Sequence, residues 1–92
     1  MNVTEEYCLV RFHKNTGRID TTLEAEGYDV LKDWALKTTT KTKDVIIFKK
    51  RTGEIAFCIS GTPHGGEIES FEQGLNVETL CPGLVAAVNA PD

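Results

Sequence analysis

The C-terminal part of this chain has no Lys or Arg. None of its ten Lys and Arg lies in residues 52–92, which hold six acidic residues. All ten lie in residues 1–51 beside eight acids, so the net charge of −4 divides into +2 and −6. Phosphate binding depends on Lys and Arg that displace counterions, which argues against the acidic part as a nucleic-acid surface. The net charge of −6 in residues 52–92 predicts either a solvated acidic surface or a face that meets a basic partner.

A long apolar run is also missing. No stretch approaches the roughly 18 apolar residues that a transmembrane helix needs. The acidic start, Met1–Glu6, has neither the basic nor the apolar part of a signal peptide. With 40% hydrophobic and 26% charged residues over 92 positions, the composition is that of one small folded domain. We therefore expect a single domain, residues 1–92, that is cytoplasmic and does not enter a membrane.

Cysteine is scarce and irregularly spaced. There are three, Cys8, Cys58 and Cys81, with no C-x-x-C pair. An odd number is untypical of a secreted disulfide framework, so we expect reduced thiols that pack as small hydrophobic side chains. The cysteines and the two histidines lack the paired spacing of structural zinc sites. No metal and no cofactor is predicted.

What the sequence does contain is an internal repeat at a shift of 36 residues, in which residues 8–19 align with residues 44–55. Each copy joins two β-branched or aromatic runs through a polar loop that ends in glycine, the pattern of a β-hairpin. A loop of three to five residues predicts a type I turn, with Gly17 or Gly53 in the left-handed conformation.

Apolar residues at helical spacing follow each predicted hairpin, over residues 28–36 and again over residues 68–75. We therefore expect an α+β fold with a duplicated ββα-ββα arrangement, the pseudo-repeats being residues 7–36 and 44–75. Its four-stranded antiparallel sheet would carry two helices on one face. In the C-terminal extension, residues 76–92, the segment Leu84–Val88 fits a short helix or an edge strand. The helix is preferred because proline suits the first helical turn.

The second predicted hairpin is apolar on both sides of its strands. Simple alternation places Ile46, Phe48, Ile55 and Phe57 on one side and a second apolar set on the other. A strand of this kind is usually covered on both sides, yet two helices on one face leave the other bare. The chain's own C-terminal segment, a second copy in a homodimer, or a different protein could cover it. The residues expected at this partner-binding face are Leu9, Val45, Ile47, Ala56 and Cys58.

The glycine-rich segment Ser60–Gly66 is a second candidate site, predicted as a loop before a helix. Its backbone N–H groups could hold an anion there, and His64 could act as acid or base beside Cys58. The spacing matches no phosphate-binding loop, and no carboxylate is placed to orient His64. No catalytic residue is therefore assigned. The candidate ligand-binding residues are Ser60, Gly61, His64, Gly65 and Gly66.

Basic residues gather at two places between Lys37 and Arg51, one in a predicted loop and one at a hairpin tip. A strand of about five residues at ~3.3 Å each separates them. No aromatic residue lies among them for base stacking, which argues against nucleic-acid binding.

These patterns favour a non-enzymatic binding module that acts by protein–protein interaction, with another protein or as a homodimer. Small acidic domains of this sort include inhibitors and accessory proteins of phages (viral proteins) and mobile elements, which is the class we expect. Two alternatives stay open. One is a small enzyme or anion-binding protein that uses Ser60–Gly66 with His64 and Cys58. The other is a nucleic-acid-binding protein that uses Lys37–Arg51.

Overall fold

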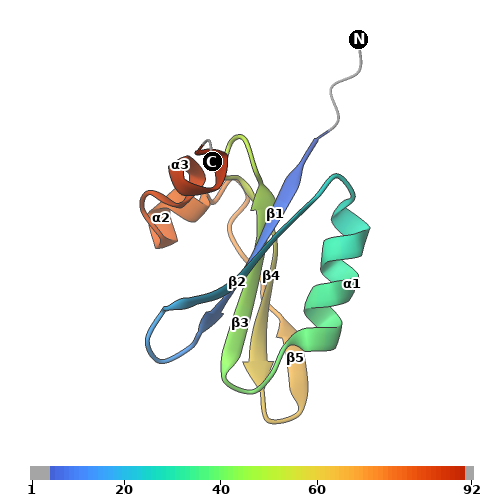
Figure 1. Ribbon diagram of the computed structural model, residues 1–92. Coiled ribbons are helices and arrows are strands. Elements are labelled where there is room, and N and C mark those ends of the chain that lie inside the picture. The colour runs from blue at the N-terminus through green and yellow to red at the C-terminus, as the bar shows by residue number, and fades with distance from the viewer. Residues whose placement is uncertain (1–4, 91–92) are drawn as a thin grey trace.

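The computed structural model describes residues 5–90 and has one antiparallel sheet with helices on both faces (Figure 1). The sheet has five strands in the order β2-β1-β3-β4-β5. The strands are β1 (Tyr7–His13), β2 (Ile19–Ala25), β3 (Lys43–Lys49), β4 (Ile55–Thr62) and β5 (Gly65–Ile68). The helices are α1 (Tyr28–Thr38), α2 (Val77–Leu80) and α3 (Leu84–Asn89). In the described part of the chain, no helix is long and apolar enough to cross a membrane.

The two predicted hairpins are confirmed, and they share their turn geometry. Gly17 has φ +70° and Gly53 has φ +83°, the left-handed conformation that favours glycine. The Gly17 N–H donates to the His13 carbonyl at 2.8 Å, and the Gly53 N–H donates to the Lys49 carbonyl at 2.7 Å. The repeat in the sequence therefore corresponds to a repeated local structure.

Each hairpin also contains a β-bulge at the equivalent position. In the second hairpin, Ile47 pairs with Phe57 and Phe48 pairs with Ile55, so Ala56 has no opposite residue in β3. One extra residue reverses the alternation of side chains beyond it. Ile55 therefore lies on one face of the sheet and Phe57 on the other, and the expectation that they share a face is wrong.

Both faces of the sheet are apolar, and each is covered by a different part of the chain. Helix α1 covers one face with Leu31 and Ala35. Beneath them lie Leu9, Val45, Ile47, Phe57 and Ile59. The C-terminal helices cover the other face with Val77 and Leu84. Beneath them lie Cys8, Val10, Ile46, Phe48 and Ile55.

The expected ββα-ββα arrangement, a four-stranded sheet with two helices on one face, is therefore wrong. Residues 28–36 are helical as predicted, within α1, and Leu84–Val88 are helical within α3. The helix expected over residues 68–75 does not form. Instead, β4 continues to Thr62 and turns into β5, which pairs Ile59 with Ile68. This pairing uses the backbone of the segment Ser60–Gly66, whose glycine content predicts a loop.

The repeated turns permit a matched test of how the C-terminal helices stabilise the second hairpin. A Cβ on Gly17 would meet nothing within 4 Å, whereas a Cβ on Gly53 would lie 2.6 Å from Asn76 Oδ1 and 2.7 Å from Val85 Cγ2. Gly17→Ala should cost only the left-handed penalty of about 1 kcal/mol. Gly53→Ala should cost about 1–3 kcal/mol more because it also overpacks this contact. Urea unfolding of both variants measures the difference, and equal losses would contradict the packing of the C-terminal helices on this turn.

Candidate functional site

The structure does not bring the five residues expected at a partner-binding face together on one exposed surface. Leu9, Val45 and Ile47 are completely buried, with 0% exposure, beneath α1. Cys58 pairs with Ile46 and packs in the layer under the C-terminal helices, on the opposite face. Ala56 lies at the bulge between the two faces. The expected fold left one face of the sheet uncovered. In the structure, α1 covers one face and the C-terminal helices cover part of the other.

The segment Ser60–Gly66 forms the end of β4, a tight turn and the start of β5. The Thr62 hydroxyl donates to the Gly65 carbonyl at 2.7 Å and accepts the His64 N–H at 3.2 Å. His64 is exposed at this tip, and Gly61 is buried. The local polar groups thus bond with one another, and the described contacts give His64 no carboxylate partner.

Cys58 and His64 are not arranged as a nucleophile and its base. The strand between Cys58 and Thr62 spans about 13 Å at ~3.3 Å per residue. Burial, with a smaller effect from Glu69, raises the pKa of the Cys58 thiol to about 11. The thiol is therefore protonated at neutral pH and is a poor nucleophile. Among residues 5–90, no group of three His, Cys, Asp or Glu side chains could hold a metal ion.

The basic residues between Lys37 and Arg51 are separated by the length of β3. Lys43 lies at one end of the strand, opposite His13, and Lys49 lies at the other end, opposite Tyr7. Beside Lys49, Lys50 forms ion pairs with Glu6 and Glu24, with N–O distances of 3.5 and 3.1 Å. The fold therefore does not join the two groups into one groove.

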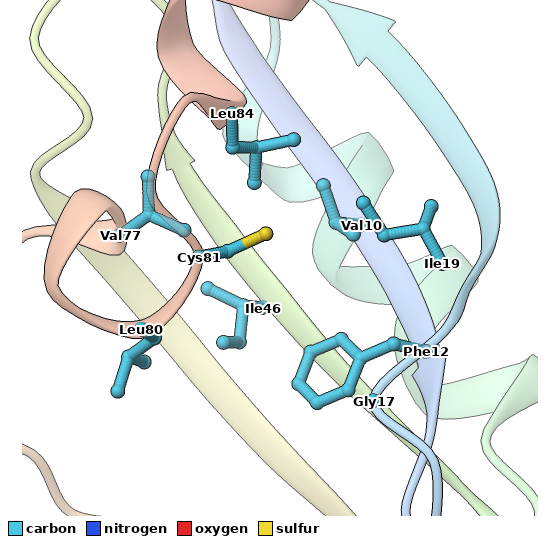
Figure 2. Close-up of a pocket in the computed structure, with 9 residues that line it drawn as sticks. All are labelled: Val10, Phe12, Gly17, Ile19, Ile46, Val77, Leu80, Cys81 and Leu84. Carbon is cyan, nitrogen blue, oxygen red and sulfur yellow. The ribbon is translucent and has the colours of Figure 1, made fainter.

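The most site-like feature is an apolar groove between the first hairpin and the C-terminal helices (Figure 2). It has a volume of about 290 Å³. The residues that line it are Val10, Phe12, Gly17, Ile19, Ile46, Val77, Leu80, Cys81 and Leu84. Strands β1 and β3 form its floor, while Ile19 and the C-terminal segment form its walls. Among the described residues, its lining is apolar apart from the Cys81 thiol, so the groove offers mainly apolar contact.

The groove exists because the second face of the sheet is only partly covered. Helices α2 and α3 have four and six residues, too few to extend over the whole face. Two large apolar side chains at the rims remain open to solvent: Ile19 is 45% exposed and Leu80 is 55% exposed. Cys81 directs its sulfur into the space between them (Figure 2).

Hydrogen bonds hold the C-terminal wall of the groove in place. The Glu78 carboxylate accepts the N–H groups of Gly83 and Val85, at 2.7 and 2.9 Å. The Val77 N–H donates to the Gly53 carbonyl at 2.8 Å, which ties α2 to the second hairpin. These contacts all lie within the chain, so the fold itself stabilises this wall.

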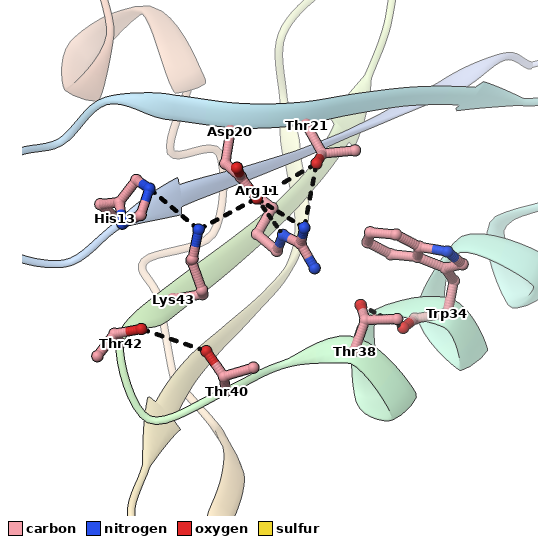
Figure 3. A network of polar contacts seen from close by, with 9 residues as sticks. All are labelled: Arg11, His13, Asp20, Thr21, Trp34, Thr38, Thr40, Thr42 and Lys43. Carbon is pink, nitrogen blue, oxygen red and sulfur yellow. Dashed lines mark hydrogen bonds and ion pairs between the residues drawn. The ribbon is translucent and has the colours of Figure 1, made fainter.

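The opposite wall is positioned by the bulge in the first hairpin. Arg11 pairs with Thr21 and Phe12 pairs with Ile19, which leaves Asp20 as the extra residue. Ile19 therefore turns toward the groove, on the face of Phe12. The Asp20 carboxylate lies on the other face, 2.6 Å from the Arg11 guanidinium and 3.2 Å from Lys43 Nζ (Figure 3).

This polar network fixes the hairpin tip. Lys43 Nζ also lies 3.0 Å from His13 Nε2, and the Arg11 guanidinium packs 5.3 Å from the centre of the Trp34 ring. Hydrogen bonds from Arg11 and then Lys43 lower the pKa of Asp20 below its ordinary value. Its contribution to stability is present above the unfolded carboxyl pKa and is lost as the pH falls through the folded pKa. At neutral pH the Asp20 carboxylate is therefore ionised and can hold both ion pairs.

Sequence reasoning missed the two groove residues that matter most for access, Ile19 and Leu80. Nothing local marks them, because the groove arises where a bulge in β2 meets a helix some 60 residues later. Comparison with protein-family models, curated proteins and solved structures finds no match. No activity of a known protein can therefore be carried over to this chain.

Proposed function

We propose that this protein is a non-enzymatic binding module that acts by protein–protein interaction through the apolar groove. A large apolar side chain of the partner would enter between Ile19 and Leu80 and contact Val10, Phe12 and Leu84. The observation that carries this proposal is a preformed apolar hollow whose two exposed rim residues are also apolar. By occupying a partner's surface, such a module could act as an inhibitor or accessory protein.

The apolar lining of the groove favours a protein side chain over a small molecule. Small-molecule sites usually measure about 300–1,000 Å³ and contain a few polar groups that fix the ligand's orientation. This groove, at about 290 Å³, lies at the lower end of that range, and its lining is apolar. Protein interfaces, in contrast, concentrate binding energy where one buried apolar anchor fills a pocket.

The groove also favours binding over catalysis. An enzyme needs a nucleophile or a general base within hydrogen-bond reach of the reacting group. The lining contains no carboxylate, imidazole or amine, and its one thiol, that of Cys81, has no base beside it among the lining residues. The described residues therefore support a binding role at this place.

Charges introduced at the rims test the proposal directly. Peptides selected from a displayed library on the unmodified protein would be the probe, with affinities measured by fluorescence anisotropy. Ile19→Lys and Leu80→Lys should each weaken binding by about tenfold or more, roughly 1.4 kcal/mol, because lysine places a charge where an apolar anchor docks. Both residues are about half exposed, so folding should be retained.

Matched controls come from apolar residues with similar exposure elsewhere. Val30→Lys on α1 and Ile68→Lys on β5, at 66% and 60% exposure, should leave affinity unchanged. Bound peptide should also slow iodoacetamide labelling of Cys81. Peptides that bind the rim variants normally, or that lose affinity equally in the controls, would overturn the assignment of the groove.

A further inference from the structure

The edge of the sheet beside the groove points to the conformation of the partner. β2 is an outermost strand of the sheet, and no strand of the described residues pairs with its outer edge. It is seven residues long, whereas the opposite edge strand, β5, has four residues. An outermost strand presents a row of N–H and C=O groups that can pair with an added strand.

The hydrogen-bond pattern shows which groups of β2 point outward. The Lys50 N–H donates to the Glu6 carbonyl, on the β3 side of β1, and the His13 N–H donates to the Arg18 carbonyl, on the β2 side. Backbone groups alternate in direction along a strand, so odd-numbered residues of β1 bond with β2. Their partners there are Thr21, Leu23 and Ala25. The N–H and C=O groups of Thr22 and Glu24 therefore face away from β1, toward the open edge.

The carboxylates of β2 form ion pairs on the two faces of the sheet, and the Glu24 side chain remains 48% exposed. Glu24 forms an ion pair with Lys50, on the face of the C-terminal helices, and Asp20 forms ion pairs with Arg11 and Lys43 on the other face. Both carboxylates thus have partners within the molecule. Residues Thr21–Ala25 continue in regular pairing beyond the bulge.

The open edge and the groove belong to one surface. Ile19, the first residue of β2, is also a wall of the groove. A strand added beside β2 would lie about 4.8 Å from it and would direct alternate side chains toward the groove side of the sheet. Edge pairing would supply main-chain hydrogen bonds, and the groove would select the side chain.

We propose that the partner binds as an extended peptide segment that adds to β2 as a sixth strand. Thr22 and Glu24 would exchange backbone hydrogen bonds with it, and one of its apolar side chains would reach over Ile19 into the groove. This inference rests on the proposed function and specifies the class of partner, an extended segment with apolar residues at alternate positions.

A proline in β2 tests the pairing without altering the groove. Proline at an outward-facing position of an edge strand removes an N–H that the folded chain does not use. Thr22→Pro should lower the affinity of a peptide selected on the unmodified protein by about tenfold or more, with a circular-dichroism spectrum like that of the parent. Thr22→Val, which keeps the N–H, is the matched control and should bind normally. The amides of Thr22 and Glu24 should become protected from hydrogen exchange when the peptide binds.

A second arm applies even where Thr22→Pro does not fold. Methylation of the peptide's backbone nitrogens at every second position should abolish binding in one register and leave it intact in the other. Equal binding of both methylated peptides, or unchanged exchange at Thr22 and Glu24, would overturn strand addition. If strand addition fails but Ile19→Lys and Leu80→Lys still abolish binding, the proposed function stands. If these two variants bind normally, the proposed function fails as well. A dimer in sedimentation that Thr22→Pro abolishes would show a second copy as the occupant and overturn the inference.

Discussion

Replacing Ile47 with lysine is expected to unfold this protein. Ile47 lies in the middle strand of five and is 0% exposed beneath α1. Loss of a buried isoleucine side chain costs about 2–5 kcal/mol, and burial of an unpaired ammonium group adds further to this cost. A small domain is stable by roughly 5–15 kcal/mol, so most molecules should lose cooperative structure. Far-UV circular dichroism and urea unfolding would measure this.

The control is Val30→Lys, on the outward side of α1, the helix that covers Ile47. Val30 is 66% exposed, and a lysine there stays in water, so the urea midpoint should barely move. The comparison also separates two arrangements of the fold. If the face of Ile47 were bare, lysine would change association and leave folding intact. A folded Ile47→Lys variant would thus contradict the cover that α1 provides.

The second large effect is expected at Gly61, which the sequence suggested as part of a ligand-binding loop. In the structure Gly61 is buried against the backbone of Thr40 and of Lys43, the first residue of β3. A Cβ there would overlap the carbonyl oxygens of Thr40 and Lys43 and lie 2.8 Å from the Thr40 carbonyl carbon. These are backbone atoms, which cannot rotate away as side chains can. Gly61→Ala should therefore cost about 3 kcal/mol or more, the upper end of overpacking effects.

Gly27→Ala is the matched control for this substitution. Gly27 precedes α1, and a Cβ there would meet only Val30 Cγ2, at 3.6 Å, an ordinary contact. The urea midpoint of Gly27→Ala should fall much less than the urea midpoint of Gly61→Ala. Similar midpoints for the two variants would contradict the close approach of the two backbone segments. The role of Gly61 is thus to admit a neighbouring backbone, and this explains a glycine at that position without a ligand.

Several structural features were predictable from the sequence because they depend on local interactions. The turns at Gly17 and Gly53 follow from loop length and from the left-handed conformation that glycine adopts easily. The helix over residues 28–36 follows from apolar spacing. The apolar character of both sides of β3 was also visible, and it indicated correctly that both faces of the sheet need cover.

The candidate site was not predictable in the same way. Alternation assigns faces only while a strand is regular, and one unpaired residue at Asp20 or Ala56 reverses every assignment beyond it. The glycines of Ser60–Gly66 suggest a loop, yet residues 60–62 lie in β4 and residues 65–66 lie in β5. The local sequence does not show this pairing of β4 with β5, because the hydrogen bonds come from the partner strand.

The sequence by itself determined one small domain, two glycine turns, one amphipathic helix and strands that need an apolar layer on each side. Only the tertiary structure decided that α1 covers one face and the short C-terminal helices cover the other. It also decided that Ile19 and Leu80 lie across a groove from each other. The physical reason is distance along the chain: turns and helices form from neighbouring residues, whereas the cover of a face and the hollow it leaves depend on contacts between remote segments.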